Sequence, residues 1–247
     1  MKNLLYIVAH PDDESLWVGG TICAFNKSED YNVYVLCLWG LLEQPDEFRE
    51  ESFYKATKEC KGSYAFIAGN GEPPIEHGLH MLKLSPEDVD LVITHPPYGD
   101  EHQHPHHKIT HIESKGWANE HNVPLSCFSF FAMPFKYEQT AIHAKRNDDL
   151  HLLNLFRVGR SEANRRFDFY PDYFIQFLVN IEDRNNMLAN YKSIDAEEHK
   201  KGYFGWTSNC EGYYLTSEGL GVFNDFIHSM PTPTNSGSLY SKYEDGF

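Results

Sequence analysis

Two short segments of the chain gather the side chains that could bind a metal ion. The first is A-H-P-D-D-E at 9–14, where His10 and Asp13 lie three residues apart across a proline-stiffened turn and can point at one place. A neutral imidazole and a carboxylate are both good zinc ligands. Asp12, between them, could face the same cavity without binding the metal and take a proton from bound water. The alternative is that the acidic run only begins a helix, where carboxylates are favourable.

The second segment is rich in histidine, with six between positions 95 and 111, namely His95, His102, His104, His106, His107 and His111. One histidine from this segment, together with His10 and Asp13, would make a two-histidine, one-carboxylate site. Such a site leaves a coordination position open for water, as catalytic zinc sites do. His107 and His111, four residues apart on an expected helix, could instead form a metal pair. A solvated loop that binds metal adventitiously is a further alternative, which the presence of both segments disfavours.

Both segments follow short apolar runs, which must position them. The pattern predicts strands at 4–9, 31–39, 65–68, 89–94 and 127–131, with helices between them at 17–27, 46–60 and 105–119. Strands that alternate with helices indicate an α/β fold, here a Rossmann-like, mostly parallel sheet with helices on both faces. Because ligands bind at the carboxyl ends of such strands, both segments stand where chemistry is expected.

The second half of the chain is less regular. A strand is expected at 174–181 and a helix at 183–193, and the Gly- and Tyr-rich text from 199 onward indicates loops and short strands around a pocket. We therefore expect one domain over 1–230, with an irregular α+β C-terminal third, and a poorly packed tail at 231–247.

Composition excludes some classes of function. The 247 residues carry a formal net charge of −15, which argues against a nucleic-acid partner. The apolar opening run is too short for a membrane span or a signal peptide, so we expect a cytoplasmic protein. The five cysteines form no C-x-x-C pair and are expected to be buried, reduced thiols.

The two segments together resemble a known family. A-H-P-D-D-E at 9–14, followed by T-H-P-P-Y-G-D-E-H-Q-H-P-H-H at 94–107, is similar to the paired motifs of the PIG-L/LmbE-like N-acetylglucosaminyl deacetylases. Weaker similarity continues around Arg49 and at 179–183 and 187–193, so the resemblance covers about 1–215. It implies one Zn²⁺ per chain, with other divalent metals as alternatives.

The resemblance also implies roles for single residues. The metal ligands would be His10, Asp13 and His107, with Asp12 as the general base. His104 takes the place of the histidine that stabilises the oxyanion and protonates the leaving amine.

The substrate would be bordered by Arg49, His77 and His102. Two positions depart from the family pattern. His106 replaces an aspartate, so that His104 lacks its usual carboxylate partner, and His77 replaces a substrate-binding aspartate.

The expected function is that of a zinc-dependent hydrolase, which removes an N-acetyl group from an amino sugar or a related small glycoconjugate. Metal-bound water would attack the acetyl carbon, with Asp12 as general base, and acetate would leave. Two alternatives stay open. One is a metal amidase acting on a non-sugar N-acyl metabolite, and the other is a degenerate carbohydrate-binding relative without turnover.

Overall fold

The computed structural model describes residues 1–39, 47–60, 63–68, 74–97, 99, 104–129, 173–191, 210–229 and 241–242. Eight strands form one sheet in the order β3-β2-β1-β4-β5-β7-β6-β8. Their bounds are β1 Lys2–Val8, β2 Tyr31–Cys37, β3 Tyr64–Ile67, β4 Leu91–Thr94, β5 Leu125–Ser129, β6 Tyr173–Leu178, β7 Cys210–Leu215 and β8 Ser241–Lys242. The helices are α1 Asp13–Trp17, α2 Gly19–Lys27, α3 Glu47–Glu59, α4 Pro74–Leu82, α5 Pro105–His121, α9 Ile181–Leu188 and α11 Ser217–Ser229, with a 3-10 turn at Pro86–Asp88.

The sheet confirms the predicted Rossmann-like α/β fold. The five strands β3, β2, β1, β4 and β5 are parallel. The strands of the C-terminal third, β7, β6 and β8, then add antiparallel to their neighbours. Because the chain builds β1, β2 and β3 outward and returns to place β4 on the other side of β1, the strand order reverses between β1 and β4. The crevice at such a switch point is where open α/β sheets bind ligands.

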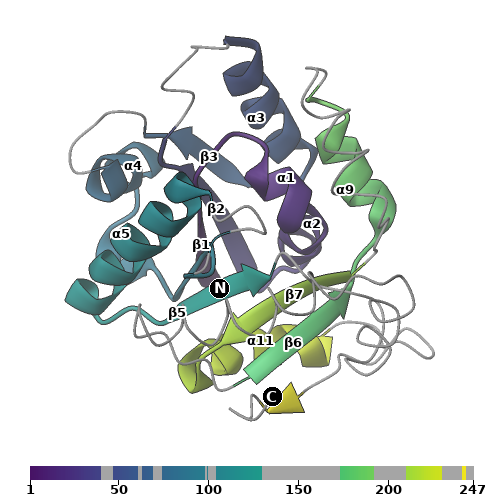
Figure 1. Cartoon of the computed structure of the whole chain (residues 1–247). Coiled ribbons are helices and arrows are strands. Elements are labelled where there is room, and N and C mark those ends of the chain that lie inside the picture. Colours follow the sequence, from purple (N-terminus) through teal and green to yellow (C-terminus); the bar gives the residue numbers. More distant parts are fainter. Residues whose placement is uncertain are drawn as a thin grey trace, which may run out of the picture.

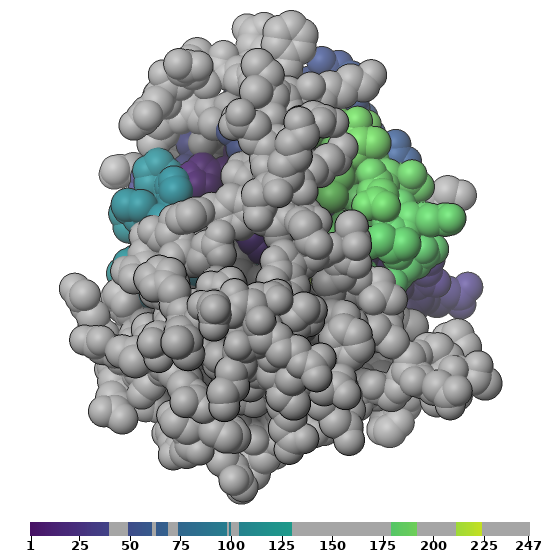
Figure 2. All heavy atoms as spheres, turned by 45° about the vertical axis from the view of Figure 1, so that its right-hand side comes forward, coloured from purple at the N-terminus to yellow at the C-terminus, as the bar shows by residue number. Residues whose placement is uncertain are grey.

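Helices cover both faces of the sheet, as predicted (Figure 1). The central strand β1 divides its side chains between two cores: Leu4, Tyr6 and Val8 belong to one, and Leu5 and Ile7 to the other. The first core includes buried residues of α2, α3, α9 and α11, and the second includes buried residues of α4 and α5. This double burial explains why β1 reads as a continuous apolar run. In the space-filling view α9 forms a green surface patch beside segments of the first third of the chain (Figure 2).

Several elements differ from the sequence-based prediction. Where one helix was expected at 17–27, the structure has two. α1 already starts at Asp13, and Val18, which is not helical, separates α1 from α2. The loops expected from 199 onward contain a long helix, α11, beside the short strand β7. In the expected tail, residues 241–242 pair with β6, and the rest of 231–247 lies outside the described residues. Within the described part, no helix is both long and apolar enough for a membrane crossing.

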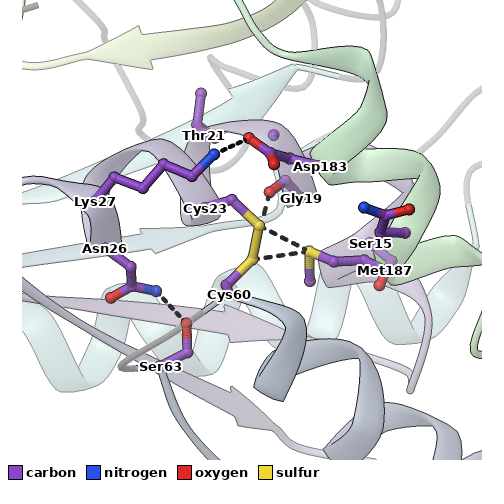
Figure 3. Close-up of a disulfide and its surroundings, with 12 residues drawn as sticks. Ser15, Gly19, Thr21, Cys23, Asn26, Lys27, Cys60, Ser63, Asp183 and Met187 are labelled. Atoms are coloured by element: carbon purple, nitrogen blue, oxygen red, sulfur yellow. Dashed lines mark hydrogen bonds and ion pairs between the residues drawn. A yellow bond between two sulfur atoms is a disulfide. The ribbon is translucent and has the colours of Figure 1, made fainter.

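The prediction that all cysteines are reduced is wrong for one pair. Cys23 on α2 and Cys60, which directly follows α3, form a disulfide (Figure 3). The Sδ of Met187 on α9 lies 3.7 Å from the Cys23 sulfur and 3.3 Å from the Cys60 sulfur. Cys37 and Cys127 are buried thiols, as predicted. Because disulfides persist chiefly in oxidising compartments, the cysteines give the expected cytoplasmic location no support.

Candidate metal centre

The A-H-P-D-D-E segment forms the turn between β1 and α1, at the switch point. Asp12 occupies the residue before α1 with φ 135° and ψ −29°, a region that non-glycine residues rarely adopt. Its carbonyl accepts hydrogen bonds from the N–H groups of Ser15, at 2.9 Å, and Leu16, at 2.8 Å, which start the helix. The acidic run therefore does begin a helix, and its side chains also build a site, so the two alternatives are compatible.

His10, Asp13 and His107 come together as the sequence predicts. One ligand atom from each lies within 4.8 Å of the others. Asp13 Oδ2 accepts the backbone N–H of His10 at 2.8 Å and lies 3.5 Å from His10 Nδ1, while Oδ1 lies 3.4 Å from His107 Nε2. We call these three residues the inner set. Asp13 and His107 are buried, whereas His10 is half-buried.

The charge of the inner set suits a divalent cation. Burial alone would raise the pKa of Asp13, but the adjacent His107 and His95 rings bring it well below its ordinary value. Asp13 is therefore an anionic carboxylate between imidazoles. Two histidines and one carboxylate are a donor set of catalytic zinc sites, so the residues present fit the ion that the sequence implies.

His95, which directly follows β4, is a contributor to which the sequence reasoning gave no role. Its Nε2 accepts the N–H of Ala9 at 3.0 Å and lies 3.3 Å from Asp13 Oδ2, and its ring stacks on His107 at 4.2 Å. Burial lowers the pKa of His95 to about 3, so the ring is neutral. His95 thus joins the ends of β1 and β4 and contacts two residues of the inner set. Its place at the end of a fully buried strand was the signal that could have found it.

His104 and His106 make a second group with His10. One ligand atom of each of these three half-buried residues also lies within 4.8 Å of the others, and His10 Nε2 lies 2.9 Å from His106 Nδ1. The ring of His106 stacks on Trp39 at 5.1 Å, and the backbone N–H of His106 donates to His104 Nδ1 at 3.2 Å. His106, which stands where the family has an aspartate, therefore faces His10 with its ring and His104 with its backbone.

Asp12 has a partner that the sequence did not predict for it. Arg49, on α3, forms an ion pair with Asp12 Oδ2, and its Nε donates to the carbonyl of Pro11 at 3.0 Å. Burial raises the pKa of Asp12, and the guanidinium of Arg49 opposes that rise. Arg49 was predicted to bind substrate; the structure places it against the predicted base, and its contact with substrate stays a prediction.

Glu14, the last residue of the motif, supports the same turn. Its Oε2 accepts the N–H of Asp12 at 3.0 Å, and its Oε1 accepts the hydroxyls of Ser15, at 2.5 Å, and Tyr191, at 2.6 Å. Burial raises the pKa of Glu14 to about 7. Tyr191 follows α9, so a late part of the chain contacts the motif. Sequence reasoning missed this contact because nothing in the pattern pairs positions 177 residues apart.

The remaining predicted residues lie elsewhere. His77 is exposed on α4, where its described ring contact is with Phe66 of β3 and not with the histidines of the site. His102 lies outside the described residues. In the alternative metal pair of His107 with His111, His111 Nδ1 lies 2.8 Å from the carbonyl of His95, and burial lowers the pKa of His111 to about 4; the pair itself stays a prediction.

Part of the chain is similar in sequence to a curated protein. No model of a known protein family matches the chain. The probable N-acetylglucosaminyl-phosphatidylinositol de-N-acetylase of Schizosaccharomyces pombe is 29% identical over 90 residues, and this match spans 36% of each protein, about a third of the curated relative.

A solved deacetylase structure shares the fold of this chain. The zinc-inhibited form of the teicoplanin deacetylase Orf2 has a TM-score of 0.50 and 13% identity, with 86% of this chain and 97% of that one covered. The 4-carboxy-2-hydroxymuconate hydratase GalB of Pseudomonas putida has a TM-score of 0.49 and 14% identity, with both chains fully covered. At 13% identity the likeness to the teicoplanin deacetylase bears on the fold alone. Over about a third of its length the chain is thus similar in sequence to a probable de-N-acetylase, and it shares its fold with a teicoplanin deacetylase.

Proposed function

We propose that the chain is a zinc-dependent hydrolase that removes the N-acetyl group from an amino sugar or a related small glycoconjugate. The observation that carries this proposal is the inner set with Asp12 beside it: three residues able to hold a metal and a buried carboxylate, Asp12, that is adjacent to one ligand and two residues from another. A metal-binding or carbohydrate-binding protein without turnover needs the ligands but not a strained, buried base. The similarity to a probable N-acetylglucosaminyl-phosphatidylinositol de-N-acetylase supports the sugar amide as substrate class.

His10, Asp13 and His107 would hold the metal ion. A zinc ion there supplies Lewis acidity, which polarises the acetyl carbonyl and makes water more acidic. The remaining chemistry belongs to the side chains around it.

Asp12 is suited to accept the proton of the attacking water. Its Oδ2 is bound to Arg49, which leaves Oδ1 as the proton acceptor. Burial raises the pKa of Asp12, and the guanidinium of Arg49 favours the ionised carboxylate and so opposes that rise. The proton then passes to the amine as the carbon–nitrogen bond breaks, which gives acetate and a free amino sugar.

His104 is suited to stabilise the oxyanion as a neutral donor. Because its Nδ1 accepts the backbone N–H of His106, a neutral His104 carries its proton on Nε2. The backbone bond thus fixes the tautomer, a task that a carboxylate partner performs in other histidine sites. A positioned donor of this kind typically contributes roughly 3–4 kcal/mol.

The test is a screen for acetate release by the purified, zinc-loaded chain. The panel contains N-acetylglucosamine, its phosphatidylinositol conjugate, N-acetylated oligosaccharides and non-sugar N-acyl amides, with Asp12→Asn as the inactive control. Release from sugars alone supports the proposal. Release from non-sugar amides alone identifies the alternative metal amidase, which the exposed position of His77, away from the site, keeps open. Binding of sugars without release would show a degenerate relative.

A further inference from the structure

His10 belongs to two sets of candidate ligands and presents a different ring nitrogen to each. Its Nδ1 lies 3.5 Å from Asp13 of the inner set, and its Nε2 lies 2.9 Å from Nδ1 of His106. The three rings of His10, His104 and His106 lie 4.8 to 5.2 Å apart between centroids. We propose that His10, His104 and His106 form an outer seat for a divalent transition metal, which shares His10 with the inner set and is antagonistic to it.

The outer seat is more accessible than the inner set. All three of its residues are half-buried, whereas Asp13 and His107 of the inner set are buried. A cation that arrives from solvent therefore meets the outer histidines first. Trp39 holds one of them in place: its ring stacks on His106 with an interplanar angle of 13°, and its Nε1 donates to Thr110 Oγ1 on α5 at 2.9 Å.

The chemistry of the seat selects the cation. Three imidazoles without a carboxylate favour Zn²⁺, Ni²⁺ and Cu²⁺ over Mg²⁺ and Ca²⁺, which prefer oxygen ligands. The first turn of α5 opposes any cation with its dipole, but this cost is only about 0.3–1 kcal/mol for a charge near an exposed helix end. That is small beside the binding free energy of zinc at protein sites, about 10 kcal/mol or more for structural sites.

Two features make the two positions antagonistic. A neutral His10 has one ring lone pair, so it can ligate an ion on the inner side or on the outer side, but not both. His104, when it binds an outer ion, must either give up the bond from the His106 backbone or lose its remaining ring proton. Ligation through Nε2 removes the Nε2–H donor proposed above, and ligation through Nδ1 takes away the backbone bond that fixes this donor in place. Metal in the outer seat therefore inhibits.

The test removes the inner set and asks whether metal still binds. In His107→Ala, and separately in Asp13→Asn, we expect isothermal titration to show about one Zn²⁺ or Ni²⁺ bound and no Mg²⁺. Adding His106→Ala to either variant should weaken that binding about tenfold or more, since loss of even an outer-shell partner of a metal ligand typically costs 10 to 100-fold. His80→Ala, which removes an exposed histidine of α4, is the matched control and should change nothing.

Far-UV circular dichroism of each metal-free variant establishes that it folds, and two different inner-set variants guard against the failure of one. If His106→Ala weakens zinc binding only while the inner set is intact, His106 is merely a hydrogen-bond partner of His10 and the outer seat does not exist. The same conclusion follows if the inner-set variants bind no metal. A zinc ion located by anomalous scattering between His10, His104 and His106 in His107→Ala would establish the seat directly.

Discussion

At Asp12 the backbone is held in a conformation that the residue would not adopt by itself. Strain of this kind costs about 1–3 kcal/mol and persists only where the surroundings determine it. Here the surroundings are the N–H groups of Ser15 and Leu16 on the Asp12 carbonyl, Glu14 on the Asp12 N–H, and Arg49 on the carboxylate. The same contacts that hold the backbone also direct the carboxylate, so its position does not depend on bound substrate.

Asp12→Asn should therefore retain the fold and the metal but lose turnover. Asparagine tolerates positive φ, while its amide cannot take a proton from water. We expect kcat to fall about 10² to 10⁴-fold, with unchanged zinc content by elemental analysis. Asp30→Asn, an exposed substitution of the same type, is the control. Near-normal acetate release from Asp12→Asn would assign the base to another residue.

At the scale of helices and strands, burial on both sides made the central strands easy to predict. β1, β2 and β4 read as apolar runs because each lies between two layers of helices. α4 and α11 were missed because their glycines read as helix breakers. In the structure one glycine of each helix allows close packing: a Cβ on Gly78 would meet Leu36 at 2.3 Å, and one on Gly219 would meet Ser126 Oγ at 2.4 Å. A sequence alone does not say which glycine breaks a helix and which one lets it pack.

Gly20, in the first turn of α2, supplies a prediction of the same kind. A Cβ there would lie 2.5 Å from the Cβ of Val179, and the Gly20 N–H donates to the buried Glu211 at 2.8 Å. We expect Gly20→Ala to lower the free energy of unfolding by about 1–3 kcal/mol through overpacking, measured by urea denaturation. Gly116→Ala on α5 is the control: its Cβ meets nothing within 4 Å, so stability should rise by roughly 0.5–1 kcal/mol. Equal effects at both positions would contradict this packing argument.

The disulfide joins two helices that border the site. Cys23 lies on α2, which follows the first motif, and Cys60 follows α3, which carries Arg49; the two cysteines are 37 residues apart. We expect the double variant Cys23→Ala, Cys60→Ala to lower the free energy of unfolding by about 2–4 kcal/mol, as loss of a disulfide that closes a loop of this length usually does. Equilibrium unfolding with and without a phosphine reductant measures the effect. The reductant should destabilise the wild type and leave the double variant unchanged. A wild type that does not respond would show that the bond is not formed in solution.

For the molecule as a whole, topology explains how much of the site could be predicted. His10 and Asp13 follow β1, and His107 lies beyond β4, so adjacent parallel strands bring both motifs to one edge of the sheet. The sequence together with the family resemblance therefore sufficed to expect these three side chains near one another, and their binding of a metal stays a prediction. It did not suffice for the partners of His10 and Asp12, because the stacking of Trp39 on His106 and the reach of Arg49 from α3 depend on tertiary packing.

The same topology predicts that metal stabilises the entire domain. An ion in the inner set would connect the turn after β1 with the first turn of α5. It would bind tightly only while both segments keep their native positions. At a free concentration of 100 times Kd such binding adds about 2.7 kcal/mol. For a domain of this size that raises Tm by about 5 to 10 °C.

We expect zinc to produce this shift in the metal-free protein, measured by differential scanning fluorimetry, and a chelator to reverse it. His10→Ala should show almost no shift, because His10 is shared by the inner set and the outer seat, whereas His80→Ala should respond like the wild type. An equal shift in His10→Ala would place the stabilising ion elsewhere on this histidine-rich chain.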